Sequence, residues 1–201
     1  MKSYNIWILD GTSVDDKTAA RQESKLLSAL VSAYPKKQWE IRPILRHVRS
    51  RSALERVLAE IRGHKPNTAA GIHFVGHAGL GEEGTYLLLG KEALSLEDRA
   101  GLEVFKSLPV DWILLSCCNV GWRGPVLRAL RLTSGCDAVF AYKGVIEDYQ
   151  AFTIDALLYH LLLVNTPPGM NEQQMTYALF RRRLGGASRQ LLIGASIVAS
   201  Y

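Results

Sequence analysis

Short apolar runs alternate along this chain with longer segments whose apolar residues recur every three or four positions. The runs have the length of buried strands, and the longer segments have the spacing of amphipathic helices. This alternation predicts an α/β domain, a three-layer sandwich whose mostly parallel central sheet of about six strands carries helices on both faces. The predicted strands are 5–9, 39–45, 70–75, 111–117, 137–142 and 191–198.

The segments between these strands complete the prediction. Residues 84–90 are expected to form an extra strand, half of a hairpin, and Pro43 indicates that the second strand lies at a sheet edge or ends early. Because no internal repeat, low-complexity tract or linker is visible, residues 1–201 are predicted to form a single domain. The predicted helices are 16–33, 52–61, 96–108, 123–132, 148–163 and 172–184.

Two of the predicted strands end in reactive side chains. His77 follows the apolar run 71–76, and Cys117 with Cys118 follows the run 111–116. Ligands of an open α/β sheet bind beyond the carboxyl ends of parallel strands, so a cysteine and a histidine placed there can act as nucleophile and base. Either group alone would be read as a loop histidine or as buried cysteines, but the two together favour catalysis.

The neighbours of these groups supply further candidates. The backbone N–H of Ala78 or Gly79 could help to bind an oxyanion. Adjacent strand residues point to opposite faces, so only one of Cys117 and Cys118 is expected to face the site. Periodicity leaves open which of the two it is.

Two other patterns have the spacing of known binding sites. The spacing of Gly79, Gly81 and Gly84 matches a dinucleotide-binding loop, but that loop needs a helix behind it, and here a strand and two glutamates follow. A hairpin is therefore favoured. His73 and His77 would lie about 13 Å apart on a strand and could not share an ion without a sharp bend. Metal ligation by the histidines with one of the cysteines stays open, although no metal is expected.

Composition narrows the class of protein. Three cysteines do not make a disulfide framework, so a reducing compartment fits, and no apolar run reaches the length of about 20 residues that a membrane helix needs. With no signal-like leader, a cytoplasmic location and no membrane contact are expected. The net charge is +5. Its clusters at 42–56 and 181–183 lack interleaved aromatics, which favours solvated helix faces or a partner-docking surface over a nucleic-acid groove.

The two motifs resemble those of the caspase-like clan of cysteine peptidases, and in particular its CHAT branch, which is related to caspases, metacaspases and separase. In that branch the histidine lies in a His-Phe-x-Gly-His-Gly pattern, matched here by residues 73–78, and the cysteine lies in a Leu-Ser-Ala-Cys pattern, matched by 115–118. The similarity continues through the strand 136–142, the acidic turn 146–149 and the helix that ends near 162. It covers roughly residues 70–184.

The resemblance implies a cysteine endopeptidase with His77 as the catalytic histidine, Cys118 as the nucleophile and Cys117 in the small-residue position before it. Two positions depart from the pattern. Ala78 replaces the glycine after the histidine, and Asn119 replaces the commoner acidic residue after the cysteine. The resemblance implies a protein or peptide substrate and no cofactor, with activation by another chain or signal, such as a regulatory partner protein.

In this clan the first specificity pocket forms beside the cysteine strand and the strand that follows. Asp137, Glu147 and Asp148 are in or near these elements and could pair with a substrate arginine or lysine. Asp148 could equally cap the following helix. Two alternatives remain: a catalytically inactive caspase-like scaffold or adaptor module, and a thiol hydrolase or transferase on a flavodoxin-like sheet.

Overall fold

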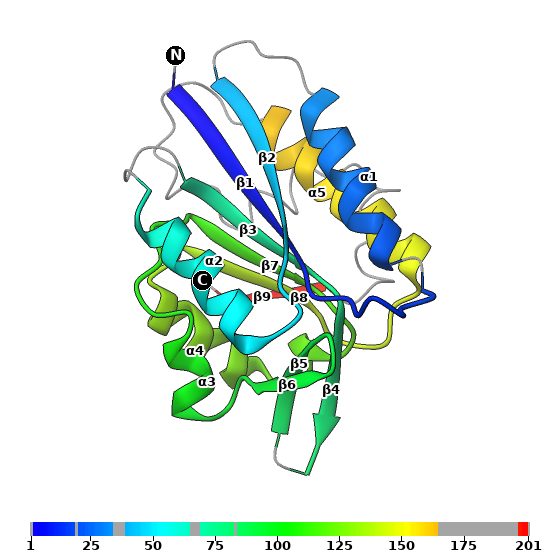
Figure 1. The fold of residues 1–201 in the computed structure, drawn as a ribbon, viewed down its shortest axis with the longest axis vertical. Helices are drawn as coiled ribbons and strands as arrows, with labels where there is room; N and C mark the ends of the chain where they lie inside the picture. Colours follow the sequence, from blue (N-terminus) through cyan, green and yellow to red (C-terminus); the bar gives the residue numbers. More distant parts are fainter. Residues whose placement is uncertain are drawn as a thin grey trace.

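A six-stranded sheet lies between two layers of helices in the computed structural model of the chain (Figure 1). The structure describes residues 2–18, 20–33, 39–64, 69–82, 84–164 and 197–200. The strand order is β2-β1-β3-β7-β8-β9, in which the first five strands are parallel and β9 runs antiparallel to β8. The strands are β1 (Lys2–Asp10), β2 (Trp39–His47), β3 (Ala69–Val75), β7 (Trp112–Ser116), β8 (Ala138–Tyr142) and β9 (Ile197–Ser200). The predicted three-layer α/β architecture is confirmed.

The helices divide between the two faces of the sheet. On one face lie α1 and α5, and on the other lie α2, α3 and α4 (Figure 1). Pro43 lies in β2, which is the edge strand, as its missing backbone donor requires. The helices are α1 (Ala20–Ala33), α2 (Arg51–Arg62), α3 (Arg99–Glu103), α4 (Gly124–Ser134) and α5 (Asp148–Val164), with a short 3-10 turn η1 at Val120–Trp122.

Two predicted helices are shorter than expected. The first begins at Ala20 rather than at residue 16, because Asp16 Oδ1 accepts hydrogen bonds from the N–H and the hydroxyl of Thr18 and holds a turn there. The predicted helix 96–108 is reduced to Arg99–Glu103. Its N-cap is Asp98, and Ser107 has a φ of 52°, which is incompatible with continuing a right-handed helix.

Two predictions near the end of the chain meet the limit of the described residues. The predicted helix 172–184 lies outside them. Of the predicted strand 191–198, only the last two residues are described, and they belong to β9, which continues to Ser200.

A small second sheet extends the carboxyl edge of the main sheet. It consists of β4 (His77–Gly81), β5 (Gly84–Leu89) and β6 (Glu92–Ser95), paired antiparallel, and it projects at the lower end of the molecule in Figure 1. The predicted hairpin is confirmed, and the glycines of the apparent dinucleotide loop belong to its first two strands. His77 is therefore the first residue of a new strand that leaves the main sheet.

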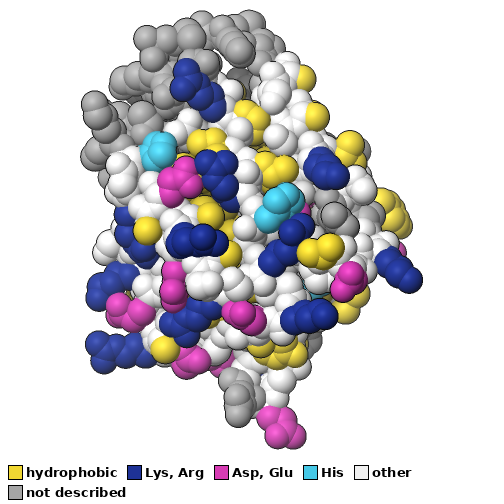
Figure 2. Space-filling model, in the orientation of Figure 1, with side chains coloured by type: hydrophobic (Ala, Val, Ile, Leu, Met, Phe, Trp, Pro, Cys, Tyr) yellow, Lys and Arg dark blue, Asp and Glu magenta, His cyan; other side chains and the backbone are white. Residues whose placement is uncertain are grey.

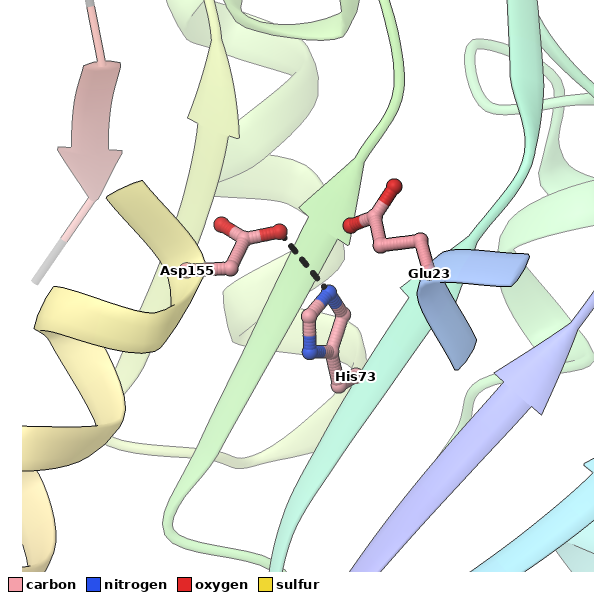
Figure 3. A group of neighbouring side chains, drawn as sticks. All are labelled: Glu23, His73 and Asp155. Atoms are coloured by element: carbon pink, nitrogen blue, oxygen red, sulfur yellow. Dashed lines mark ion pairs between the residues drawn. The ribbon is translucent and has the colours of Figure 1, made fainter. Parts of the chain in front are cut away.

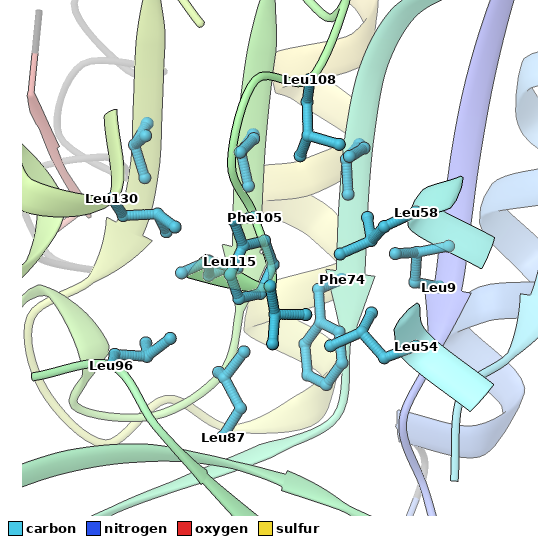
Figure 4. Packing of buried hydrophobic residues seen from close by; sticks show 14 of the residues in the cluster. Leu9, Leu54, Leu58, Phe74, Leu87, Leu96, Phe105, Leu108, Leu115 and Leu130 are labelled. Carbon is cyan, nitrogen blue, oxygen red and sulfur yellow. The ribbon is translucent and has the colours of Figure 1, made fainter. Parts of the chain in front are cut away.

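Each face of the sheet has its own apolar core. The core beneath α2, α3 and α4 includes Phe74, Leu115 and Phe105, which lie together in Figure 4. The core beneath α1 and α5 includes Ile8, Leu114 and Tyr159. Successive residues of each strand contribute to opposite cores, as the two-residue period of a strand requires. This alternation assigns each strand-end side chain to one face.

Charged side chains of both signs share the surface. On the face drawn in Figure 2, lysine and arginine side chains are interspersed with aspartate and glutamate. Within the basic cluster 42–56, Arg46 pairs with Glu60 at 2.8 Å and Arg51 pairs with Glu55 at 2.8 Å. Among the helices described, none is long and apolar enough to cross a membrane.

Candidate active site

The carboxyl ends of the two central strands place the predicted histidine and cysteine at the same level of the sheet. Val75 of β3 is paired in register with Ser116 of β7. His77 follows Val75 by two residues, and Cys118 follows Ser116 by two residues. Because neighbouring strands lie about 4.8 Å apart, both side chains leave the sheet within a small area of its edge.

The two adjacent cysteines have different environments. Cys117 is only 2% exposed and belongs to the apolar core beneath α2, α3 and α4. Burial raises the pKa of the Cys117 thiol well above its ordinary value, and the nearby carboxyl group of Glu23 raises it further. Cys118 is half-buried and packs against the opposite core, beneath α1 and α5. Cys118 is thus the cysteine that a substrate could reach.

A tight turn holds the Cys118 side chain at the edge. Asn119 has a φ of 63°, a left-handed conformation that asparagine adopts more readily than most residues, and its N–H donates to the carbonyl of Gly144. Ile146 brackets the sulfur: its N–H lies 3.5 Å from Cys118 Sγ, and its carbonyl oxygen lies 3.6 Å from the same atom. The N–H can stabilise a thiolate, and the carbonyl can accept from a thiol.

His77 is held by a carboxylate from the loop after β1. Its Nε2 lies 2.7 Å from Asp16 Oδ2, and the His77 side chain is 39% exposed whereas that of Asp16 is 6% exposed. Burial alone would raise the pKa of Asp16, but the two hydrogen bonds from Thr18 and the contact with His77 outweigh burial and lower it. Asp16 is therefore an ionised, fixed partner for the imidazole.

His77 and Cys118 lie on the same side of the sheet. Ala78 packs against the core beneath α2, α3 and α4, so the preceding residue, His77, points to the opposite side. Its contact with Asp16, just before α1, agrees with that direction. Cys118 packs on the side of α1 and α5 as well. In the described part of the chain, His77 Nε2 bonds to Asp16 and Cys118 Sγ to Ile146; a direct bond between the two groups is not formed.

The two candidate oxyanion donors lie in the strand β4. Ala78 is paired in register with Leu87, and Gly79 with Tyr86. Successive N–H groups of a strand point in opposite directions, so one of the two points toward β5 and the other away from it. A Cβ at position 79 would lie 2.4 Å from the Tyr86 ring, so a larger residue there would force this ring to move.

The structure separates the three acidic residues proposed for substrate binding. Glu147 and Asp148 directly follow Ile146, whose backbone contacts the sulfur of Cys118. Asp137 does not lie there: it precedes β8, and the five residues of that strand put it about 17 Å from the carboxyl edge. The expectation that Asp137 lines the same pocket is corrected for this reason. Asp148 begins α5, where a carboxylate is favoured.

A buried polar cluster lies beneath this edge, between the sheet and the helices α1 and α5. Glu23 from α1, His73 from β3 and Asp155 from α5 point toward one another (Figure 3). His73 Nε2 lies 3.2 Å from Asp155 Oδ2, and both side chains are fully buried. Each member has a further partner: Ser116 donates to Glu23, Tyr142 donates to Asp155, and His73 Nδ1 bonds to the hydroxyl of Tyr159.

The charges of this cluster can balance internally. Burial and the neighbouring Asp155 raise the pKa of Glu23 well above its ordinary value, which favours the neutral acid. Burial opposes ionisation of Asp155 too, but the charge and hydrogen bond of His73 outweigh it and lower the pKa of that carboxyl. One ligand atom from each residue lies within 4.8 Å of the others, a spacing that would also accept a metal ion. The hydrogen bonds among these side chains fill the same space without an ion.

Sequence reasoning missed three of these groups. The sequence pattern places Asp16 at the start of a helix and gives no signal for Glu23 and Asp155. Asp16 carried a readable signal, because it is an acidic residue in the loop beyond a parallel strand, two positions before a threonine that can fix it. His73 and His77 lie on a strand and at the start of the next strand, not on one helix face. They contact different carboxylates.

Comparisons with known proteins support the fold. No protein-family model matches the chain, and no curated protein matches it in sequence. Its structure is similar to that of a secreted C11 cysteine protease from Bacteroides thetaiotaomicron, solved in complex with an irreversible peptide inhibitor. The TM-score is 0.54 at 13% sequence identity, over 92% of this chain. This chain spans 60% of the length of that protein. The chain thus has an α/β fold similar to that of this C11 cysteine protease.

Proposed function

We propose that this protein is a cysteine endopeptidase that cleaves peptide bonds with Cys118 as nucleophile and His77 as general base and acid. The observation that supports this most is the shared side of the sheet edge: the accessible cysteine and a carboxylate-bound histidine follow adjacent, in-register strands. The structural similarity to a C11 cysteine protease supports the same chemistry at the level of the fold. The CHAT branch is the assignment that the two sequence motifs favour.

The proposed reaction has two stages. Cys118 Sγ, its proton passed to His77, attacks the carbonyl carbon of the peptide, and the oxyanion is bound by backbone N–H groups near Ala78 and Cys118. His77 then returns the proton to the departing amine, which leaves a thioester. Water, activated by His77, hydrolyses the thioester and regenerates the thiol. In this proposal, substrate binding brings the Cys118 sulfur and the His77 imidazole into hydrogen-bonding contact, because catalytic hydrogen bonds often form fully only in the substrate complex.

Exposed apolar side chains around the edge suit a peptide substrate. Six large apolar side chains are exposed in the described residues, and four of them belong to the loops, the hairpin or the first turn of α5: Val14, Leu80, Val145 and Tyr149, at 60%, 41%, 82% and 67%. Val14 is two residues from Asp16, and Val145 adjoins Ile146. Apolar side chains that gather at one exposed place commonly mark a binding site. We infer that they contact apolar residues of an extended peptide.

The acidic residues that follow Ile146 suggest that the substrate residue before the cleaved bond is basic. Glu147 and Asp148 follow the backbone group that contacts the sulfur, so a lysine or arginine of the substrate could pair with them. Cleavage of fluorogenic peptides that differ only at this position would decide it. Faster cleavage after an acidic or apolar residue would rule out the basic preference.

A second function, an adaptor with an inactive peptidase fold, is favoured by two observations. Ala78 replaces the glycine of the motif, and the hydrogen bonds of Cys118 go to Ile146 rather than to His77. In either case a regulatory partner protein or signal could act on the domain. The two functions differ in whether the sulfur of Cys118 reacts.

The deciding experiment compares variants of the two cysteines. Cys118→Ala should reduce peptide cleavage by about 10³-fold or more, because no other described thiol is accessible at the edge. It should also abolish labelling by a peptide that carries a thiol-reactive electrophile. Cys117→Ala, the matched control, should retain both activities. Full activity of Cys118→Ala, or the absence of selective labelling in the unaltered protein, would contradict the proposal.

A further inference from the structure

We propose that Asp16 is a third functional group of this site, a positioning residue that holds the proton of His77 on Nε2 and so leaves Nδ1 to exchange the proton with Cys118. This inference rests on the proposed function for its consequence in catalysis. Its structural part concerns only Asp16, Thr18 and His77, and it can be tested without a substrate.

The first support is the direction of the carboxylate. Asp16 Oδ1 accepts two hydrogen bonds from Thr18, at 2.8 Å from the backbone N–H and 2.7 Å from the hydroxyl. Oδ2 is thereby left for His77 Nε2, at 2.7 Å. A carboxylate whose two oxygens have different, fixed partners cannot rotate without losing hydrogen bonds. The orientation of the imidazole therefore follows from the loop after β1.

The second support is the choice of ring nitrogen. An ionised carboxylate only accepts hydrogen bonds, so the nitrogen that faces it must carry a proton. The pKa of Asp16 is lowered, which keeps the carboxylate ionised even at mildly acidic pH. In a neutral imidazole the other nitrogen, Nδ1, is then the base. A histidine bound in this way can take a proton on Nδ1 without first changing its tautomer.

The third support is the origin of the three groups. Asp16 follows β1, His77 follows β3 and Cys118 follows β7, and these three strands are consecutive in the sheet. The chain leaves β1 toward β2 on one side and returns to β3 on the other, so the loops after β1 and β3 diverge at this point of the edge. Asp16 is thus positioned by the same feature of the sheet that creates the site.

The structure makes a specific prediction about substitution by asparagine. In Asp16→Asn, the Oδ1 atom still accepts from Thr18, so the amide nitrogen takes the place of Oδ2 and donates toward His77 Nε2. The imidazole must then carry its proton on Nδ1, where it cannot accept the thiol proton. Asp16→Ala removes the carboxylate without imposing the wrong tautomer. Asparagine should therefore be more harmful than alanine, although it is the closer match in shape.

The test combines a spectroscopic and a kinetic measurement on the full chain. Long-range ¹H–¹⁵N correlation spectra at pH about 8.5, above the ordinary histidine pKa of about 6.5, report which ring nitrogen of His77 carries the proton. In a Cys118→Ala background we expect the proton on Nε2, and on Nδ1 after Asp16→Asn is added. With Cys118 present, Asp16→Asn should reduce kcat on the order of 10⁴-fold, the loss known for the same change in a serine protease triad. Asp16→Ala should reduce it at least tenfold less.

The outcomes separate this inference from the proposed function. If the unaltered protein cleaves no peptide but the tautomer of His77 changes as expected, the peptidase proposal fails and the role of Asp16 stands. If peptides are cleaved but Asp16→Asn is as active as Asp16→Ala with an unchanged tautomer, the role of Asp16 is overturned. Thr18→Val, which removes one of the two bonds that fix Asp16, should narrow the difference between asparagine and alanine at position 16.

Discussion

The structure contains two histidine–carboxylate pairs whose histidines lie four residues apart in the sequence. One pair is buried and the other lies at the surface. His73 and Asp155 are fully buried, 3.2 Å apart, and share a cluster with Glu23 (Figure 3). His77 and Asp16 are 2.7 Å apart at the rim, where the imidazole is 39% exposed. A buried pair is strongly destabilising when one partner is removed, whereas an exposed pair contributes little to folding. The same two residue types therefore join α5 to the sheet in one place and are available for chemistry in the other.

The largest effect is expected from breaking the buried pair. Asp155→Ala leaves His73 without its charge partner and removes the nearer of the two acceptors of the Tyr142 hydroxyl, so the free energy of unfolding should fall by about 3–5 kcal/mol. Urea denaturation followed by circular dichroism measures the loss. A loss of less than about 1 kcal/mol in the free energy of unfolding would show that the cluster does not join α5 to the sheet. Asp155→Asn, which keeps the acceptor for Tyr142, should be less destabilising.

A smaller effect, which depends on pH, is expected at Glu23. Its folded pKa is raised above the ordinary value of 4.5, so the stabilisation is complete below that value and is lost as the pH rises through the folded pKa. Each unit of difference contributes about 1.4 kcal/mol. Glu23→Gln cannot ionise and should be more stable than the unaltered protein at pH about 8.5, but not at pH about 4, in matched urea titrations. Parallel stability curves would contradict this.

The lowered pKa of Asp155 acts in the opposite direction. Its contribution is present above the ordinary value of 3.8 and is lost as the pH falls through the lower, folded value. Ionisation of Glu23 therefore lowers the free energy of unfolding at high pH, and protonation of Asp155 lowers it at low pH. The unaltered protein should be most stable between these limits.

The smallest effect on folding is expected at the rim. Asp16→Ala should change the free energy of unfolding by no more than about 1 kcal/mol, because His77 is solvated and the loop before α1 is exposed. The same urea titration that detects the loss in Asp155→Ala measures it. A large loss would mean that Asp16 is chiefly structural and would remove the contrast between the two pairs.

Much of the fold could be predicted from local pattern. Apolar runs marked the strands, Pro43 marked an edge, and the glycines after His77 marked a hairpin, because each depends on backbone geometry that nearby residues determine. The helix 96–108 was overestimated because Ser107 adopts a left-handed conformation that apolar spacing does not reveal. Asp137 was placed in the pocket although strand direction alone puts the first residue of a parallel strand at the far edge.

The sequence by itself determined that a histidine and a cysteine each end a strand, and that only one of Cys117 and Cys118 can face the site, since strand periodicity is local. The motif resemblance favoured Cys118, and only the tertiary structure showed that Cys117 is buried beneath α2, α3 and α4 while Cys118 is partly exposed on the side of α1 and α5, because this depends on which face of β7 each helix layer covers. It alone brought Asp16 to His77 across 61 residues, and Ser116 to Glu23 across 93. Partners so distant are set by the order of strands and the packing of helices, which no local pattern encodes.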